Sequence, residues 1–384
     1  MAEKIKKFID CYIPITTCNL RCHYCYVTLN REFDKEIFPL KYSPEHIGKA
    51  INKERFGGIC CFNLCAKGET LMLPEISKLI YEMLNQGHYV MVVTNGTLTK
   101  VFDEILKIDS ELLKRLFFKF SFQYLEFKRL NLFEKFFENI KKVDKAGCSY
   151  TLEITPNDEL IPYIEDVKNM AINNIGAIPH VSVARDSRSE DLPILTKYSR
   201  KEYKKIWEVF NSKMFEYKLS VFNKKRKEFC YAGAWSYHLD LENGNLRQCY
   251  CGEILQNIFE DLNSNIVEKP IGYNCPEAHC YNAHAWLTWG DIPEHNAPTY
   301  LEMRERNTNN GMIWCKEPIK SFFKTKLKES NEEFSFYKKI KYSQKYKSII
   351  NNIFSVKNEY SKNIKRKVIT ILGLKIKIRK TRAI

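Results

Sequence analysis

The chain has 384 residues, of which 44% are apolar and 28% are charged, and it contains 14 cysteines. This composition is typical of a folded globular protein and excludes a chain that is mainly disordered. At roughly 150 residues per domain, the length is sufficient for two domains and an appendage.

The N-terminus, MAEKIKKFIDCYIPIT, lacks the apolar core and small-residue cleavage site of a signal peptide, and no run of 18 apolar residues occurs. The sequence therefore predicts a cytoplasmic protein. In that reducing compartment, clustered cysteines bind metal or react more often than they form disulfides.

The net charge of +15 is not spread evenly along the chain. Residues 321–384 contain 18 of the 61 lysines and arginines but only 4 of the 46 acidic residues. The rest of the chain is therefore close to neutral, and the charge belongs to a C-terminal segment.

Strands and helices are predicted to alternate through the first half. Ser43 followed by Pro44 is typical of a helix start, and Gly87 and Gly147 are typical of helix ends. Repeated right-handed βα crossovers predict an α/β fold, a partial (β/α)6 TIM-like barrel over residues 1–200, with reactive groups at the carboxyl ends of its strands. The strands are expected at 7–15, 58–64, 88–94, 116–124, 149–155 and 178–184.

Three cysteines follow the first predicted strand in the stretch TTCNLRCHYCYV, residues 16–27. Cys18, Cys22 and Cys25 have the spacing C-x3-C-x2-C. Thiolates are the usual ligands of a [4Fe–4S] cluster, and three of them leave one iron open for a non-protein ligand. The alternative is a structural zinc site of these cysteines with His23 or a distant fourth ligand.

Together with two later turns, this loop resembles the radical SAM superfamily over about residues 7–185. CNLRCHYC is similar to that family's cluster loop, KGE (67–69) stands where the family usually has Gly-Gly-Glu, and TNG (94–96) is similar to the end of its third strand. Lys67 departs from the pattern by replacing the first glycine. The resemblance implies a [4Fe–4S] cluster on the three cysteines, bound S-adenosylmethionine and a reduced flavodoxin- or ferredoxin-type electron donor. The residues implied to bind the cofactor are Tyr24, Gly68, Glu69, Thr94, Asn95 and Gly96.

Strands four to six add less specific candidates at their ends. Ser121 and Arg185 are the ones we assign to the cofactor. Arg185 is the stronger candidate, because a guanidinium pairs bidentately with a carboxylate. Ordinary polar positions at strand ends are the alternative for each of them. The other polar residues in these stretches are Gln123, Glu153, Thr155 and Ser182, and Cys60, Cys61 and Cys65 are expected in the core.

The second half, residues 201–320, is predicted to form a small α+β cysteine-rich domain. NGN (243–245) predicts a hairpin turn. The spacing of Cys230, Gly244 and Cys249 and the phrase QNIFEDL (256–262) resemble the twitch or shortened SPASM extension of radical SAM enzymes, which implies one auxiliary [4Fe–4S] cluster. A four-cysteine zinc module is the alternative. The ligands expected are Cys230, Cys249, Cys275 and Cys280, with Cys251 as a replacement and Cys315 as a bystander or distant ligand.

The segment from Tyr281 to Trp289 mixes hydrogen-bonding groups with aromatic rings that are suited to polyols or sugars. Packing of those aromatics against the barrel is the alternative. The residues concerned are Asn282, His284, Trp286 and Trp289.

Residues 321–384 are predicted to be a basic amphipathic tail. Ile349, Ile350, Ile353 and Phe354 have helical spacing among lysines, and KVITILGLKIKIRK alternates apolar and cationic residues. Such a segment can lie on an anionic membrane leaflet; a solvated tail or a docking arm is the alternative. Nucleic acid is not expected as a partner, because the basic run lies far from the cluster motifs.

These observations predict a cytoplasmic radical SAM oxidoreductase of dehydrogenase type, peripheral at the inner face of the membrane. The expected reaction oxidises or rearranges a C–H bond of a carbohydrate or nucleotide-sugar-like small molecule, in surface polysaccharide biosynthesis. A peptide-maturing enzyme and a non-enzymatic zinc-binding or nucleic-acid adaptor are the alternatives. The sequence identifies no catalytic acid or base.

Overall fold

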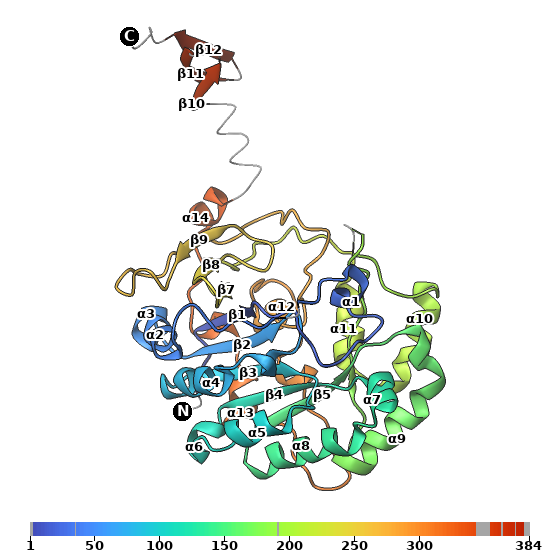
Figure 1. Ribbon diagram of the computed structural model, residues 1–384. Coiled ribbons are helices and arrows are strands. Elements are labelled where there is room, and N and C mark those ends of the chain that lie inside the picture. Colours follow the sequence, from blue (N-terminus) through green and yellow to red (C-terminus); the bar gives the residue numbers. More distant parts are fainter. Residues whose placement is uncertain are drawn as a thin grey trace.

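The computed structural model describes residues 3–34, 36–189, 192–342, 354–361, 364–372 and 374–379. Six parallel strands come first and are hydrogen-bonded in the order in which they follow one another along the chain (Figure 1). This arrangement confirms the expected α/β sheet of a partial barrel. The strands are β1 (Lys7–Ile13), β2 (Cys60–Ala66), β3 (Tyr89–Thr94), β4 (Leu116–Ser121), β5 (Ser149–Ile154) and β6 (His180–Val181).

Helices between these strands cover one face of the sheet (Figure 1). The Ser43 hydroxyl accepts a hydrogen bond from the His46 N–H at a helix start, as predicted. Gly87 and Gly147 have φ of +75° and +87° just after helix ends, also as predicted. The helices are α1 (Tyr26–Asn30), α2 (Pro44–Ala50), α3 (Lys53–Phe56), α4 (Ile76–Asn85), α5 (Thr99–Ile105), α6 (Ser110–Leu113), α7 (Tyr124–Leu130), α8 (Phe133–Lys145) and α9 (Ile164–Ile175).

The opposite, inner face of the sheet changes character along the strands. Phe8, Tyr89 and Phe117 are buried near the strand starts in one apolar cluster. Towards the strand ends the same face carries polar groups, such as Asn63, whose amide donates to the Asp10 carboxylate at 2.7 Å. Side chains alternate between the two faces along a strand, so these residues share one face. That face is apolar near the strand starts and polar near the strand ends.

The cysteine-rich half does not build a separate sheet. β7 (Ser236–Asp240) pairs in parallel with β1, and β8 (Asn245–Arg247) and β9 (Ile254–Asn257) extend the sheet to nine strands in the order β6-β5-β4-β3-β2-β1-β7-β8-β9. Gly244 has a φ of +81° at the predicted hairpin turn. The sheet thus crosses the predicted boundary at residue 200, after which come α10 (Arg200–Trp207) and α11 (Lys213–Val221).

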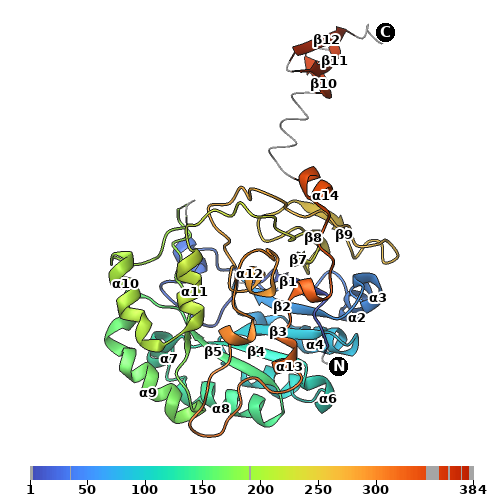
Figure 2. The same cartoon turned by 180° about the vertical axis from the view of Figure 1, so that it is seen from behind.

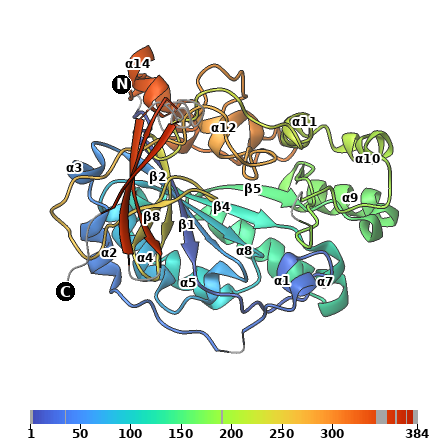
Figure 3. The ribbon, with the colours of Figure 1, turned by 90° about the horizontal axis from the view of Figure 1, so that it is seen from above.

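The C-terminal segments cover the inner face, so the sheet lies between two layers (Figures 2 and 3). They include α12 (Trp286–Trp289), α13 (Ile319–Phe322) and α14 (Phe336–Lys341). The rings of Trp286 and Trp289 lie 5.5 Å and 6.0 Å from the Phe8 ring, and both side chains are buried. Packing against the barrel is therefore the correct interpretation of these tryptophans, and the polyol-stacking interpretation is wrong for them.

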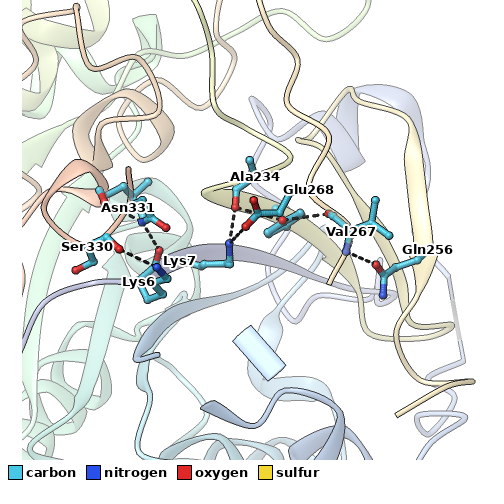
Figure 4. Close-up of polar contacts among 10 residues, drawn as sticks. Lys6, Lys7, Ala234, Gln256, Val267, Glu268, Ser330 and Asn331 are labelled. Atoms are coloured by element: carbon cyan, nitrogen blue, oxygen red, sulfur yellow. Dashed lines mark hydrogen bonds and ion pairs between the residues drawn. The ribbon is translucent and has the colours of Figure 1, made fainter. Parts of the chain in front are cut away.

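The start of β1 is fastened to the second half of the chain (Figure 4). The Lys7 ammonium donates to the Ala234 carbonyl at 2.6 Å and to the Glu268 carboxylate at 2.8 Å. The Lys6 ammonium donates to the Ser330 carbonyl at 2.7 Å, and the Asn331 amide donates to the Lys6 carbonyl at the same distance. These contacts fix β1, whose other end leads to the cysteine loop.

The predicted tail divides into two parts. Phe322 and Phe323 are buried, and Phe322 stacks on Tyr89 with ring centroids 3.7 Å apart, so the first part packs on the inner face of the sheet. Further on, β10 (Phe354–Ser361), β11 (Ile364–Ile371) and β12 (Leu374–Arg379) form an antiparallel sheet. Phe354 thus begins a strand, and the helical prediction is wrong from there on; Ile349, Ile350 and Ile353 lie outside the described residues.

Among the helices of the described residues, none combines the length and apolar character that crossing a membrane requires.

Candidate active site

A cavity of about 420 Å³ opens at the carboxyl ends of the parallel strands. It brings together residues from the first loop, the KGE and TNG turns, and the ends of β4 to β6. Gly96 is the one predicted cofactor residue that does not line it. Those that line it are Cys18, Cys22, Tyr24, Cys25, Gly68, Glu69, Thr94, Asn95, Ser121 and Arg185.

The cysteine loop holds its three sulfurs on this cavity by local backbone structure. The Leu20 N–H donates to the Cys18 sulfur at 3.4 Å. Cys25 precedes the first turn of α1, so its sulfur lies near the free N–H groups of Val27 and Thr28. Backbone donors and a helix N-terminus favour the thiolate form of a cysteine.

Burial opposes that preference. It raises the pKa of Cys18 to about 11, and it also raises the pKa of Cys22 and Cys25. The neighbouring cysteines raise the pKa of Cys22 further, because three thiolates repel one another. One buried and two half-buried thiols thus share one cavity, and a metal centre would favour their anionic form, so this donor set fits an iron–sulfur cluster.

The KGE turn is tied to the chain that leads into the cysteine loop. The N–H groups of Gly68 and Glu69 donate to the carbonyls of Ile15 and Thr17 at 2.8 and 2.9 Å. A Cβ atom at residue 68 would lie 2.1 Å from the Thr17 carbonyl oxygen, so glycine is required there. Lys67, the departure from the family pattern, does not disturb this approach.

Glu69 is buried, and both of its carboxylate oxygens are engaged. One accepts from the Thr94 hydroxyl at 2.6 Å and the Leu71 N–H at 3.0 Å, and the other accepts from the Asn95 N–H at 2.8 Å. Burial raises the pKa of Glu69, while these hydrogen bonds act in the opposite direction. The carboxylate is held in one orientation on the cavity wall.

The TNG turn supports the cysteine loop from the other side. The Asn95 amide donates to the Asn19 side-chain oxygen at 2.8 Å and points to the Cys18 sulfur at 3.8 Å. Gly96, with a φ of +74°, lies under this turn, where a Cβ would come within 2.8 Å of the Phe120 and Phe136 rings. The role that the structure gives Gly96 is to shape the turn.

The far wall consists of the less specific candidates at the ends of β4 to β6. The Tyr24 hydroxyl donates to the Gln123 side-chain oxygen, and Ser121, Thr155 and Ser182 add hydroxyl groups to the cavity. Glu153 does not line the cavity. The Arg185 guanidinium donates to the Tyr281 carbonyl at 2.9 Å, which connects this wall to the cysteine-rich half.

Sequence reasoning did not place every lining residue at this cavity, and four of those that it missed bear on the chemistry. Cys65, expected in the core, reaches the cavity, and Lys218, Tyr250 and His284 enter it from the second half of the chain. His284 had been considered for the substrate only as part of the aromatic segment. A lysine between the apolar side chains of Tyr217 and Leu219 was the available signal for Lys218.

A second cavity, of about 60 Å³, lies in the cysteine-rich half. All four predicted auxiliary ligands and the replacement Cys251 line it, whereas Cys315 is buried elsewhere, in the apolar cluster on the inner face. The carboxylate oxygen Oδ2 of Asp291 and both ring nitrogens of His279 are buried at this cavity without a hydrogen-bond partner. Five thiols beside unpartnered polar atoms fit a metal centre in type, whether it is iron–sulfur or zinc.

Within the described ranges, no group of three His, Cys, Asp or Glu side chains is arranged to hold a single metal ion.

Three solved structures with similar folds are radical SAM enzymes or their complexes. SuiB of Streptococcus suis bound to S-adenosylmethionine has 14% identity and a TM-score of 0.48 over 67% of this chain and 64% of that one. The enzyme anSMEcpe with bound AdoMet has 14% identity and a TM-score of 0.46 over 90% and 96%. BtrN in complex with AdoMet and 2-DOIA has 12% identity and a TM-score of 0.36 over 68% and 81%.

This chain thus spans less than two thirds of the length of SuiB. No curated protein sequence matches the chain. The family model described as the radical SAM superfamily matches residues 12–156, which include the cysteine loop and both turns. The chain therefore contains a radical SAM domain.

Proposed function

We propose that the protein is an enzyme that cleaves S-adenosylmethionine reductively and uses the resulting radical to oxidise or rearrange a C–H bond of its substrate. One observation carries this proposal: the three cysteines, the KGE turn and the TNG turn line a single cavity within the region that the family model matches. When bound at Cys18, Cys22 and Cys25, a [4Fe–4S] cluster supplies the electron for that cleavage.

The chain's own residues bind and orient the reactants. The backbone of the KGE turn and the fixed carboxylate of Glu69 offer an acceptor for the amino group of S-adenosylmethionine. Arg185 offers a guanidinium for its carboxylate. Because Glu69 and Asn95 are already hydrogen-bonded to their neighbours, little reorganisation is required when the cofactor binds.

For the substrate, a carbohydrate or nucleotide-sugar-like molecule is supported by the hydrogen-bonding groups of the far wall. Thr155 and Ser182 supply hydroxyls, and His284 supplies a ring nitrogen, Nδ1, that is buried without a partner. Such groups suit a polyhydroxylated ligand. An oxidation of dehydrogenase type, as in surface polysaccharide biosynthesis, is the reaction class that we propose, with a reduced flavodoxin or ferredoxin as electron donor.

For the second cavity we propose one auxiliary [4Fe–4S] cluster on Cys230, Cys249, Cys275 and Cys280. The gathering of these cysteines around one cavity supports it, and Cys251 at the same cavity is the replacement ligand. We propose residues 201–320 as the domain that holds this cluster, with its strands β7 to β9 joined to the sheet of residues 1–200.

The basic segment is proposed to attach a cytoplasmic enzyme to an anionic membrane surface. Its support is the excess of lysine and arginine in residues 321–384, at about 1 kcal/mol per basic residue near such a surface. Because residues 319–329 pack on the sheet, the test is a truncation after Tyr342. Sedimentation with anionic liposomes should be lost, and equal sedimentation of the truncated and full-length proteins would contradict the attachment.

The test of the enzymatic proposal is anaerobic reconstitution with iron and sulfide, followed by reduction in the presence of S-adenosylmethionine. The wild type should release 5′-deoxyadenosine, and C22A should release none. C148A is the matched control, because Cys148 is a buried cysteine that lines neither cavity. Release by C22A at the wild-type rate would show that the cluster assignment is wrong.

A deuterium-labelled substrate library tests the second half of the proposal. Transfer of deuterium from a sugar C–H position into 5′-deoxyadenosine supports a carbohydrate substrate. Transfer from a peptide and from no sugar would replace the carbohydrate proposal with peptide maturation.

The metal content of the protein tests the remaining alternative. Bound zinc without iron would support a zinc-binding adaptor instead.

A further inference from the structure

Lys218 lies on α11 and reaches the cavity from the second half of the chain. Its ammonium donates to the Ser182 hydroxyl at 2.6 Å. Among the described residues it forms no ion pair with a carboxylate. A partly buried ammonium with only a neutral partner is unusual, because removing a charge from water is costly unless an opposite charge compensates it.

The surroundings of Lys218 add positive charge instead of compensating it. Burial, together with the charges of Arg185, Arg304 and Lys119, lowers the pKa of Lys218 to about 7, while Glu153 acts in the opposite direction. Lys119 is 7% exposed and Arg304 is fully buried; neither lines the cavity, so Lys218 and Arg185 are the cations of this group that reach it.

The one carboxylate among these groups is already engaged. Glu153 lies 3.0 Å from the Arg304 guanidinium, which leaves Lys119, Arg185 and Lys218 without an acidic partner in the described part of the chain. Glu69, an acid that does line the cavity, already accepts three hydrogen bonds on the opposite wall. The groups around Lys218 therefore carry an excess of positive charge that no described side chain balances, and such a region attracts an oppositely charged ligand.

We propose that the substrate carries an anionic group, a phosphate or a carboxylate, and that Lys218 binds it. The proposal rests on the proposed function, because it assumes that the substrate shares the cavity with S-adenosylmethionine. Arg185 is assigned to the cofactor carboxylate, and Lys67, which also lines the cavity, is paired with Glu32 at 3.5 Å, so Lys218 is the cation left for the substrate. The Ser182 hydroxyl holds the ammonium towards the cavity and can itself donate to the bound anion.

Equilibrium dialysis of the reconstituted holoenzyme, with S-adenosylmethionine present and no reductant, tests the proposal. The probes are inorganic pyrophosphate and glucuronate, which separate a phosphate from a carboxylate. The variants are K218M, K218R and, as a matched control, K213M. Lys213 is an exposed lysine on the same helix and is paired with Glu302 at 3.3 Å outside the cavity.

The wild type should bind at least one probe, and K218M should weaken that binding at least ~10-fold, as expected for the loss of a charge-assisted hydrogen bond. K218R should restore most of the affinity, and K213M should bind like the wild type. If K218M does not fold, K218Q takes its place. A wild type that binds neither probe, or a K218M that binds as tightly as the wild type, would overturn the proposal.

Dialysis does not depend on turnover, so the two proposals fail separately. A wild type that binds neither probe but releases 5′-deoxyadenosine normally would overturn only the role of Lys218. A wild type that binds the probe but releases no 5′-deoxyadenosine would overturn the proposed function.

Discussion

The first cavity takes its three predicted cluster ligands from one loop, residues 18–25, and also contains Cys65, whereas the second gathers five cysteines from residues 230–280. Around the first, the polar side chains of Glu69, Asn95 and Asn19 are hydrogen-bonded to one another or to the backbone. Around the second, His279 and Asp291 keep buried polar atoms without partners. At the cysteine loop, the first cavity is therefore ordered by the protein's own hydrogen bonds, whereas an unpartnered ring nitrogen of His284 lies on its far wall. At the second cavity, unpartnered polar groups lie among the cysteines themselves, where a bound centre can satisfy them.

The largest expected effect is on the approach of the KGE turn to the cysteine loop. G68A places a Cβ within 2.1 Å of the Thr17 carbonyl, so the turn or the loop must move, at a cost on the order of 3 kcal/mol or more. The free energy of unfolding, measured with denaturant, and the iron content should both fall. In the control G48A the new Cβ meets only the flexible Glu82 side chain at 3.2 Å, so little change is expected. A G68A protein with wild-type stability and iron would contradict the protein-ordered first cavity.

The buried side chain of His88 lines neither cavity, so its titration tests the stability of the sheet alone. His88 lies before β3, where its Nε2–H donates to the Ile51 carbonyl at 2.7 Å and its Nδ1 accepts from the Cys60 N–H at 3.1 Å. Burial lowers the pKa of His88 from 6.5 to about 4. The unfolded chain therefore binds a proton first as the pH falls, and stability present above pH 6.5 is lost progressively towards pH 4.

The loss at full protonation amounts to about 3 kcal/mol at 1.36 kcal/mol per pKa unit. It is measured as the difference between the wild type and H88Q in denaturant unfolding from pH 7.5 to 4.5, because glutamine can make both hydrogen bonds without titrating. A constant difference across that range would contradict the burial argument.

Much of the first region could be predicted from the sequence, because its signals are local. The six strands follow from apolar runs, and the cysteines and turns at their ends are adjacent in sequence. Lys218, Tyr250 and His284 could not be predicted, since they reach the cavity only after the second half packs on the sheet. Composition likewise cannot distinguish a buried tryptophan from an exposed one, which is why Trp286 and Trp289 were considered as sugar platforms.

A smaller effect is expected for the side chain that points to Cys18. N95A removes an amide 3.8 Å from the Cys18 sulfur, and hydrogen bonds to cluster sulfurs raise the reduction potential. Loss of a hydrogen bond worth ~1 kcal/mol should make the reduction potential of the first cluster more negative by ~40 mV, and that of the second should not change. An EPR-monitored redox titration measures both. Equal shifts in the two signals would show that the two centres are not independent.

The central claim is that the two cysteine-lined cavities each hold their own cluster. The iron and sulfide content of the reconstituted protein tests this claim. The wild type should contain about eight irons per chain, and C22A and C280A about four each. C315A should retain about eight, because Cys315 lies at neither cavity. About four irons in the wild type, with no loss in C280A, would contradict a second cluster.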